Sequence, residues 1–345
     1  MEITLLPKFL QVELTYACNS KCSFCYNPTH NGKIITSSLI KILSEVNSYH
    51  IRHVQLIGGE VSILPELPAY LDALDKVEWR SIVTNGRRYR HDIKGKVNEI
   101  YLSLHGDEGT HEILTSEPGT FSAIEENAKR YVDWGIDVNS DTVLTKYNSE
   151  EIFAIAVHAK SLGMKRLFLN IFQPEGIGSN RPDFSPSIEQ IRSAIGQMIR
   201  ARDEIDFEMY FGTSTPMCLD QRLFTERLAF RCGAGEWFAS INPQGEMRIC
   251  NHSTKSYGNV MSTPLHEIWH AKKINSDYRD VRMSNTICDG CAAFLICRGG
   301  CRLDENGKYR VDPIVTRDVS QLLSPDTIRD LVRNYEAAPY PISFS

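Results

Sequence analysis

The sequence predicts an α/β fold: a larger first domain of parallel strands with helices outside, followed by a small cysteine-rich domain. Strand and helix patterns alternate through the first two-thirds of the 345 residues, which is typical of a parallel sheet. From about Phe207 the pattern changes, because cysteines return and short strand-like runs surround Gly and Pro. We therefore expect residues 1–206 to form the core, and residues 207–345 to form the second domain and a C-terminal helix.

The individual elements follow from the spacing of apolar residues. Six core strands are expected at Phe9–Cys18, His53–Glu60, residues 80–86, a run ending at residues 103–106, residues 137–145 and Arg166–Pro174. Helices are expected at Ile35–Tyr49, Leu64–Val77, Phe121–Trp134, Ser149–Leu162 and, closing the core, Ser187–Asp203. Residues 237–250 predict a β-hairpin with Pro-Gln-Gly as its turn. Functional groups should then gather at the carboxyl ends of the core strands.

Composition excludes several classes of protein. No apolar run approaches the roughly 18 residues of a membrane span, and the N-terminus has no basic-then-apolar signal. The net charge of −5 argues against a nucleic-acid partner. Ten cysteines without an export signal are typical of metal ligation in a reducing compartment. We therefore expect a cytoplasmic protein with no membrane and no nucleic-acid partner.

Three cysteines follow the first strand. Cys18, Cys22 and Cys25 have the spacing CxxxCxxC. Three thiolates can hold three irons of a four-iron cluster and leave the fourth iron open to a small ligand. Zinc is the alternative, but a closed zinc site needs a fourth ligand, for which this window offers only His30 at an unusual spacing.

This cysteine pattern resembles the signature of the radical SAM enzymes, and three strand ends extend the resemblance. The second strand ends in Gly58-Gly59-Glu60, which resembles the run that contacts the amino group of S-adenosylmethionine in that family. The next two end in Thr84-Asn85-Gly86 and in residues 103–106, where His105 stands in a position at which Asp is commoner. The resemblance implies a partial barrel of six βα units that is open on one side.

The resemblance also implies which residues contact S-adenosylmethionine. Phe24, inside the cysteine loop, corresponds to an aromatic residue beside the adenine, although loop packing would also explain it. Ser103, Asn139 and Gln173 lie near predicted strand ends and are candidates for the ribose or carboxylate. Residues 174–178 resemble the glycine-containing end of the sixth strand. The full candidate set is Phe24, Gly58, Gly59, Glu60, Thr84, Asn85, Ser103, Asn139 and Gln173.

Seven further cysteines follow residue 210. Cys232 and Cys250 form the pattern C-x12-G-x4-C, and residues 288–301 form C-x2-C-x5-C-x3-C. Together they resemble the SPASM domain, which carries auxiliary iron–sulfur clusters in peptide-modifying radical SAM enzymes. The usual pattern ends with one more cysteine, and none follows Cys301. A structural zinc knot and a half-module with one auxiliary cluster are the alternatives.

The resemblance implies a ligand set for each auxiliary cluster. The last cysteine of the four-cysteine run crosses over, so that one cluster is held by Cys218, Cys232, Cys250 and Cys301. The second is held by Cys288, Cys291 and Cys297 and lacks a fourth ligand. Asp304, Asp312 and Asp318 are candidates for that ligand, or the site stays open to substrate. Cys218 is the member that no motif spacing fixes.

The implied chemistry is reductive cleavage of S-adenosylmethionine to methionine and a 5′-deoxyadenosyl radical, which abstracts hydrogen from a substrate. We expect a maturase that crosslinks a ribosomally made peptide oxidatively through a C–C or C–S bond. Dehydrogenation of a small molecule such as an aminocyclitol and peptide epimerisation are the enzymatic alternatives. An electron-transfer protein is the alternative outside enzymology.

The expected partners are a precursor peptide and a reductant such as flavodoxin or ferredoxin. Because the first strand begins at Phe9, we expect no leader-binding domain before it. Either a separate leader-binding protein recruits the peptide or the core does so itself. Arg87, Arg88 and Arg90 form a basic stretch that is a candidate dock for an acidic leader.

Overall fold

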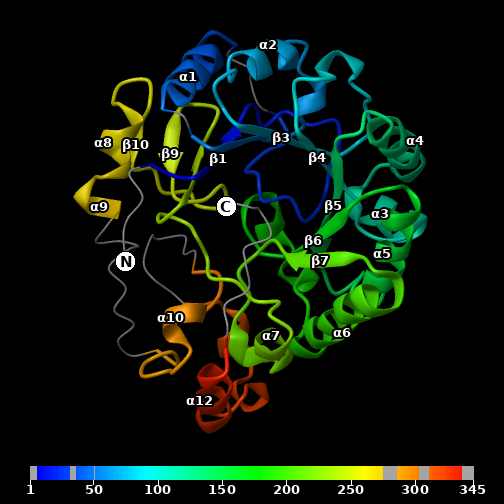
Figure 1. Cartoon of the computed structure of the whole chain (residues 1–345), viewed down its shortest axis with the longest axis vertical. Helices are drawn as coiled ribbons and strands as arrows, with labels where there is room; N and C mark the ends of the chain where they lie inside the picture. The colour runs from blue at the N-terminus through cyan, green and yellow to red at the C-terminus, as the bar shows by residue number, and fades with distance from the viewer. Residues whose placement is uncertain (1–5, 32–35, 50, 275–285, 303–310, 336–345) are drawn as a thin grey trace.

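The computed structural model describes residues 6–31, 36–49, 51–274, 286–302 and 311–335. Within these residues one curved sheet has the strand order β10-β9-β8-β1-β2-β3-β4-β5-β6-β7 (Figure 1). The strands are β1 (Phe9–Glu13), β2 (His53–Ile57), β3 (Trp79–Thr84), β4 (Glu99–Ser103), β5 (Asp137–Leu144), β6 (Arg166–Ile171), β7 (Glu208–Phe211), β8 (Phe238–Ile241), β9 (Glu246–Arg248) and β10 (Gly258–Asn259).

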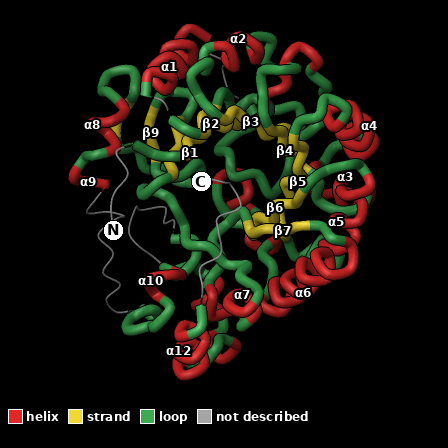
Figure 2. Tube along the Cα trace, viewed as in Figure 1, coloured by secondary structure: helices red, strands yellow, loops and turns green. Residues whose placement is uncertain are grey.

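The helices of the first domain cover the outside of this sheet. Figure 2 shows the strands as an arc, with α1, α2, α4, α5 and α6 along its convex side. These helices and the short α3 are α1 (Thr36–Ser48), α2 (Leu67–Asp72), α3 (Glu108–Thr115), α4 (Thr120–Val132), α5 (Ile152–Ser161) and α6 (Ile188–Ile205). The later helices are α7 (Arg222–Thr225), α8 (Leu265–Trp269), α9 (Lys272–Ile274), α10 (Phe294–Cys297), α11 (Ile314–Arg317) and α12 (Pro325–Arg333). The predicted α/β fold with a parallel sheet core is confirmed.

Strand β1 lies in the middle of the sheet and is buried on both faces. It pairs in parallel with β2 on one side and with β8 on the other. Leu10 and Val12 are fully buried and belong to the main apolar core, with Val54 and Leu56 of β2. Phe9 and Gln11 alternate with these two residues and line a cavity on the opposite face of the strand.

The first two strands end earlier than predicted, because the chain leaves the sheet to build loops. After Glu13 the backbone N–H of Leu14 still donates to Ile57, and the chain then turns where the Ala17 N–H donates to the hydroxyl of Thr15. The loop after β2 closes onto this turn through the N–H of Gly59, which donates to the Thr15 carbonyl at 2.6 Å. The ends of β1 and β2 are therefore fixed against each other.

The sheet continues across the predicted domain boundary at residue 207. Strand β7 adds to the β6 edge in parallel, and β8 of the predicted hairpin adds to the β1 edge. The β8–β9 hairpin has its turn at residues 242–245, where Gly245 has a φ of +82°. The cysteine-rich segment is thus joined to the core by the sheet itself.

None of the described helices is both long and apolar enough to cross a membrane.

Candidate functional site

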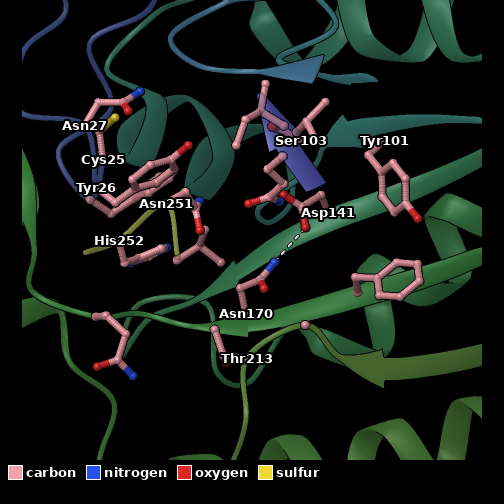
Figure 3. A pocket seen from close by; sticks show the side chains of 18 of the residues that line it. Cys25, Tyr26, Asn27, Tyr101, Ser103, Asp141, Asn170, Thr213, Asn251 and His252 are labelled. Atoms are coloured by element: carbon pink, nitrogen blue, oxygen red, sulfur yellow. Dashed lines mark hydrogen bonds between the residues drawn. The ribbon is translucent and has the colours of Figure 1, made fainter. Parts of the chain in front are cut away.

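A cavity of about 340 Å³ lies at the carboxyl ends of the core strands. Its wall includes two sets of thiols, Cys18, Cys22 and Cys25 from the first loop and Cys232, Cys250 and Cys301 from the last third of the chain. Of the residues predicted to contact S-adenosylmethionine, those on the wall are Phe24, Gly58, Gly59, Glu60, Thr84, Asn85, Ser103 and Gln173. One cavity therefore brings together groups from both predicted domains (Figure 3).

The cysteine loop is packed against the Gly-Gly-Glu turn so closely that no side chain fits between them. A Cβ on Gly59 would lie 2.2 Å from the carbonyl oxygen of Ala17. Gly58 has a φ of +143°, and its carbonyl accepts from the side-chain amide of Asn27 at 2.8 Å. These glycines are required because two backbones approach each other here.

The loop after β6 holds the other side of the cysteine loop. The N–H of Gly178 donates to the Cys25 carbonyl at 2.8 Å, and that of Ile177 donates to Asn27 at 3.0 Å. A Cβ on Gly176, whose φ is +55°, would lie 2.0 Å from the Tyr26 carbonyl oxygen. The glycines predicted at the end of the sixth strand thus support the first cysteine set.

Glu60 connects two of the predicted strand ends. Its buried carboxylate accepts from the Ser62 N–H at 2.8 Å, the Thr84 hydroxyl at 2.5 Å and the Asn85 N–H at 2.7 Å. Burial raises the pKa of this carboxyl, and the three donors act in the opposite direction. Glu60 therefore fixes the Thr84–Asn85 turn relative to the glycines while its own carboxylate lies on the cavity wall.

The Asn85 side chain connects this turn to the cysteine loop. Its amide donates to Asn19 at 2.7 Å and to Ser20 at 3.2 Å, and lies 3.9 Å from the sulfur of Cys18. Arg87 donates to the Asn19 carbonyl and is 3.7 Å from Glu117. Arg87 is thus occupied in holding the cysteine loop.

Arg90 contradicts the predicted arginine dock. Its side chain is only 5% exposed and donates to Asp92 at 2.7 and 2.8 Å and to the carbonyls of Ser62 and Leu64. A buried guanidinium with these partners serves packing, so including Arg90 in a leader dock was wrong. Of the three arginines only Arg88 is exposed.

Phe24 is held in place by a pair of histidines. Its ring meets His105 edge-on at 4.8 Å between centroids, and His105 stacks on His111 at 5.5 Å. Burial lowers the pKa of His111 to about 4, so the ring is neutral at pH 7. The His111 Nδ1 accepts from the His105 N–H at 3.1 Å, which leaves Nε2 carrying the proton. The histidine at the place where Asp is commoner therefore supports the aromatic residue.

Asn139 lies outside the cavity wall. It is the third residue of β5, fully buried, and its amide donates to Glu99. Asp141, two residues further along the same face of the strand, reaches the cavity and accepts from the amide of Asn170 at 2.6 Å (Figure 3). Asn139 belongs to a strand that reaches the cavity, but it lies further from the carboxyl end of that strand than Asp141 does.

Asp141 makes stability depend on pH. Burial raises the pKa of this carboxyl to about 6, against roughly 3.9 in an unfolded chain. The folded state then binds the proton more tightly, so the free energy of unfolding should decrease as the pH rises from about 4 to about 6. Asp141→Asn should remove this slope and raise the free energy of unfolding at pH 7 by about 1–3 kcal/mol.

Urea unfolding at several pH values measures both effects. Asp137→Asn, at the other end of β5, is the matched control because it breaks ion pairs to Lys165 and Arg166 at 2.6 and 3.2 Å. It should not raise stability. An Asp141→Asn protein with the parent's pH slope would refute this assignment of the slope.

The wall residues that sequence analysis missed include Tyr26, Asn27, Asn251 and His252. Tyr26 and His252 stack with ring centroids 4.5 Å apart (Figure 3). The available signal was position, because the first pair directly follows Cys25 and the second directly follows Cys250. These contacts place the first cysteine loop beside the late cysteines.

All ten cysteines are described, are free of disulfides, and fall into three sets. Cys18, Cys22 and Cys25 form the first, and burial followed by the neighbouring thiols raises the pKa of Cys22. Cys232, Cys250 and Cys301 pack around one small apolar cluster beside the cavity. The remaining four pack at the main core, away from the cavity wall: Cys218, Cys288, Cys291 and Cys297.

Cys218 packs apart from the cysteines with which sequence analysis grouped it. Sequence analysis grouped it with Cys232, Cys250 and Cys301, but it packs against the main core with Cys288, Cys291 and Cys297. The predicted crossover of Cys301 away from Cys297 agrees with the observed sets. Gly299 and Gly300, with φ of +79° and +78°, let the chain reverse between these two cysteines.

Cys301→Ala should therefore damage a cluster at Cys232 and Cys250 and spare one at Cys288 and Cys291. The reason is that Cys301 packs with Cys232 and Cys250 beside the cavity. Electron paramagnetic resonance of variants that keep one auxiliary set at a time can separate the two signals. A Cys301→Ala protein that loses only the Cys288/Cys291 signal would contradict the crossover.

The cavity wall has polar atoms that fit a bound cofactor. Asn27 Oδ1, His111 Nε2 and His252 Nδ1 are buried without a hydrogen-bond partner among the described residues. Buried polar atoms normally have partners, so a ligand in the cavity would satisfy such groups. Among the described residues no three His, Cys, Asp or Glu side chains converge on a single metal ion. A cluster instead places each thiolate on a different iron.

Comparison with known proteins identifies the class. The radical SAM superfamily model matches residues 12–165, and the SPASM iron–sulfur cluster-binding domain matches residues 232–292. A PqqA peptide cyclase of Granulibacter bethesdensis is 24% identical over 312 residues, covering 86% of this chain and 82% of that protein. The mycofactocin maturase MftC of Mycolicibacterium smegmatis is 24% identical over 314 residues, covering 86% and 78%. Streptococcus suis SuiB, bound to precursor peptide SuiA, shares the fold with a TM-score of 0.75 at 16% identity, covering 90% and 76%.

Residues 12–165 form a radical SAM domain, and residues 232–292 form a SPASM iron–sulfur cluster-binding domain. The cofactors of this protein are accordingly a [4Fe–4S] cluster with an open iron, S-adenosylmethionine and auxiliary iron–sulfur clusters. The three thiols, the glycine turn and the unpartnered wall atoms fit such groups.

Proposed function

We propose that this protein is an oxidoreductase that crosslinks a ribosomally made precursor peptide through a C–C or C–S bond. The observation that carries the proposal is that the first cysteine set and Cys232, Cys250 and Cys301 line the same cavity. A substrate in that cavity lies between a site for radical formation and a site for electron acceptance. One of the named relatives is a PqqA peptide cyclase, which supports a peptide substrate.

When bound, the first cluster would supply the electron that cleaves S-adenosylmethionine to methionine and a 5′-deoxyadenosyl radical, and an auxiliary cluster would accept one electron from the substrate. A crosslink removes two hydrogen atoms from the peptide. One is transferred as an atom to give 5′-deoxyadenosine, and the other leaves as a proton and an electron. The net change is therefore a two-electron oxidation.

The chain's own residues position and enclose the reactants. Glu60 offers a carboxylate to the amino group of S-adenosylmethionine and holds the Thr84–Asn85 turn. Phe24, supported by His105, offers a ring face for adenine. Ser103 and Gln173 are within the same wall and are proposed to contact the ribose or carboxylate. The cavity is lined more by apolar than by polar surface, which excludes water from a reactive radical.

The distribution of cysteines favours crosslinking over epimerisation. Peptide epimerisation needs a cysteine that returns a hydrogen atom to the substrate. Each of the ten cysteines belongs to one of the three sets, so no thiol stands apart near the cavity.

The proposed partners are the precursor peptide and a cytoplasmic reductant such as flavodoxin or ferredoxin. Arg90 is buried and Arg87 donates to the cysteine loop, so the three arginines do not form a dock for an acidic leader. Recruitment of the leader by a separate binding protein is the simpler proposal.

Anaerobic incubation tests the function. The reconstituted protein, dithionite and S-adenosylmethionine should give 5′-deoxyadenosine. Addition of the peptide encoded by a short Cys- or aromatic-rich reading frame beside the gene should give a product lighter by two hydrogen atoms. Turnover of a small sugar-like compound, with that peptide unchanged, would overturn the peptide proposal.

A further inference from the structure

The late cysteines divide into four and three, with Cys218 in the larger set. Cys218, Cys288 and Cys291 pack against the main apolar core of which Cys297 is a buried member. Cys232, Cys250 and Cys301 instead surround the small cluster of Ala234, Ile249 and Ile274. Only this second set reaches the cavity wall.

The backbone on both sides of Cys218 is tied to the second domain. The N–H of Met217 lies 3.3 Å from the sulfur of Cys297 and is directed toward it. The carbonyl of Cys218 accepts from the Leu323 N–H at 2.9 Å. A Cβ on Gly300 would lie 2.5 Å from Pro216 Cγ, so the segment before Cys218 packs directly on the turn between Cys297 and Cys301.

The electrostatic surroundings of Cys218 agree with this packing. The ionisable groups that act on its thiol are the thiols of Cys297, Cys288 and Cys291.

The carboxylates considered for this position have other roles. Asp312 is buried and accepts from the N–H groups of Cys301 and Ile314 at 3.2 and 3.1 Å. Asp318 accepts from Ser320 and Gln321 and caps the turn that they form. Asp304 lies outside the described residues.

We propose that Cys218, which precedes the SPASM motif, is the fourth thiolate of the cluster held by Cys288, Cys291 and Cys297. It takes the place of the cysteine that the usual pattern has after the four-cysteine run. The auxiliary site with only three thiols is then the one on the cavity wall, at Cys232, Cys250 and Cys301. The proposal rests on the auxiliary clusters of the proposed function, but not on the substrate.

Spectroscopy of cluster-loaded variants tests the assignment without turnover. All variants are made in a background in which Cys18, Cys22 and Cys25 are Ala. Two double variants then identify the signal of each auxiliary cluster: Cys288→Ala/Cys291→Ala and Cys232→Ala/Cys250→Ala. Cys218→Ala should change the signal that is lost in Cys288→Ala/Cys291→Ala and leave the Cys232/Cys250 signal intact. Asp312→Asn is the matched control and should leave both signals. A Cys218→Ala protein in which only the Cys232/Cys250 signal changes would overturn the proposal. The proposal would also be overturned if Asp312→Asn removed the Cys288/Cys291 signal and Cys218→Ala did not.

Alkylation tests which cluster Cys218 ligates even if the Cys218→Ala protein does not fold, because the alkylated proteins keep Cys218. Iodoacetamide should label Cys218 in the Cys288→Ala/Cys291→Ala protein and not in the Cys232→Ala/Cys250→Ala protein. The opposite labelling would overturn the assignment. Absence of iron beyond the first cluster in the parent protein would instead refute the auxiliary clusters themselves.

Discussion

Replacing Cys22 with alanine should reduce formation of 5′-deoxyadenosine to the level of a protein-free control. Cys22 is one of the three thiols of the first cysteine set, and two thiolates hold a four-iron cluster poorly. The variant should keep the iron and the brown colour of the auxiliary clusters that the seven late cysteines hold. Anaerobic assay of product, together with iron and sulfide analysis, measures both expectations.

Lys21→Ala provides the matched control, because Lys21 is the exposed neighbour in the same loop. It should retain cleavage of S-adenosylmethionine. A Cys22→Ala protein that cleaves at the parent rate would show that the first cysteine set is misassigned. A colourless Cys18/Cys22/Cys25 triple-alanine protein that contains zinc would favour a structural knot in the second domain.

Glu60→Ala should have the largest effect on stability among the wall residues. It leaves the donors of Ser62, Thr84 and Asn85 without their acceptor inside the protein. Buried donors that lose their partner cost about 1–3 kcal/mol each, and partial relaxation should bring the loss in free energy of unfolding to ~2–4 kcal/mol. Binding of S-adenosylmethionine should be lost as well, because the Thr84–Asn85 turn loses its position.

Glu60→Gln separates the two roles. It keeps the shape of the side chain but turns an NH₂ group toward one of three donors, so stability should fall less than in Glu60→Ala. Equilibrium unfolding and isothermal titration with S-adenosylmethionine measure the pair. If Glu60→Ala unfolds like the parent protein, the three hydrogen bonds do not contribute to the fold as described.

Local patterns predicted the fold and the first half of the site well. Gly58, Gly59 and Glu60 could be predicted because a glycine pair at a strand end reports a close backbone approach, and the structure shows that approach at Ala17. The cysteine spacing likewise predicted three thiols on one loop. The parallel sheet followed from the alternation of strands and helices, since each parallel connection places its loop at the same edge.

What failed depends on contacts between distant segments. Nothing in the spacing around Cys218 says which cysteines it meets, because that is decided by packing of residue 216 on residue 300. Arg90 looked like part of a solvated basic stretch, but carbonyls near residues 62–64 accept its guanidinium. Asn139 and Asp141 share one face of β5. Only Asp141 lines the cavity, because it lies nearer to the carboxyl end of the strand.

Hydrogen transfer tests the central claim most directly. The precursor peptide should be made with deuterium on its aliphatic and aromatic side-chain carbons, then incubated anaerobically with the reconstituted protein, reductant and S-adenosylmethionine. The proposed function predicts that 5′-deoxyadenosine gains one deuterium in step with loss of hydrogen from the peptide. Unlabelled 5′-deoxyadenosine formed alongside a crosslinked, deuterium-depleted peptide would contradict radical abstraction from the peptide in this cavity.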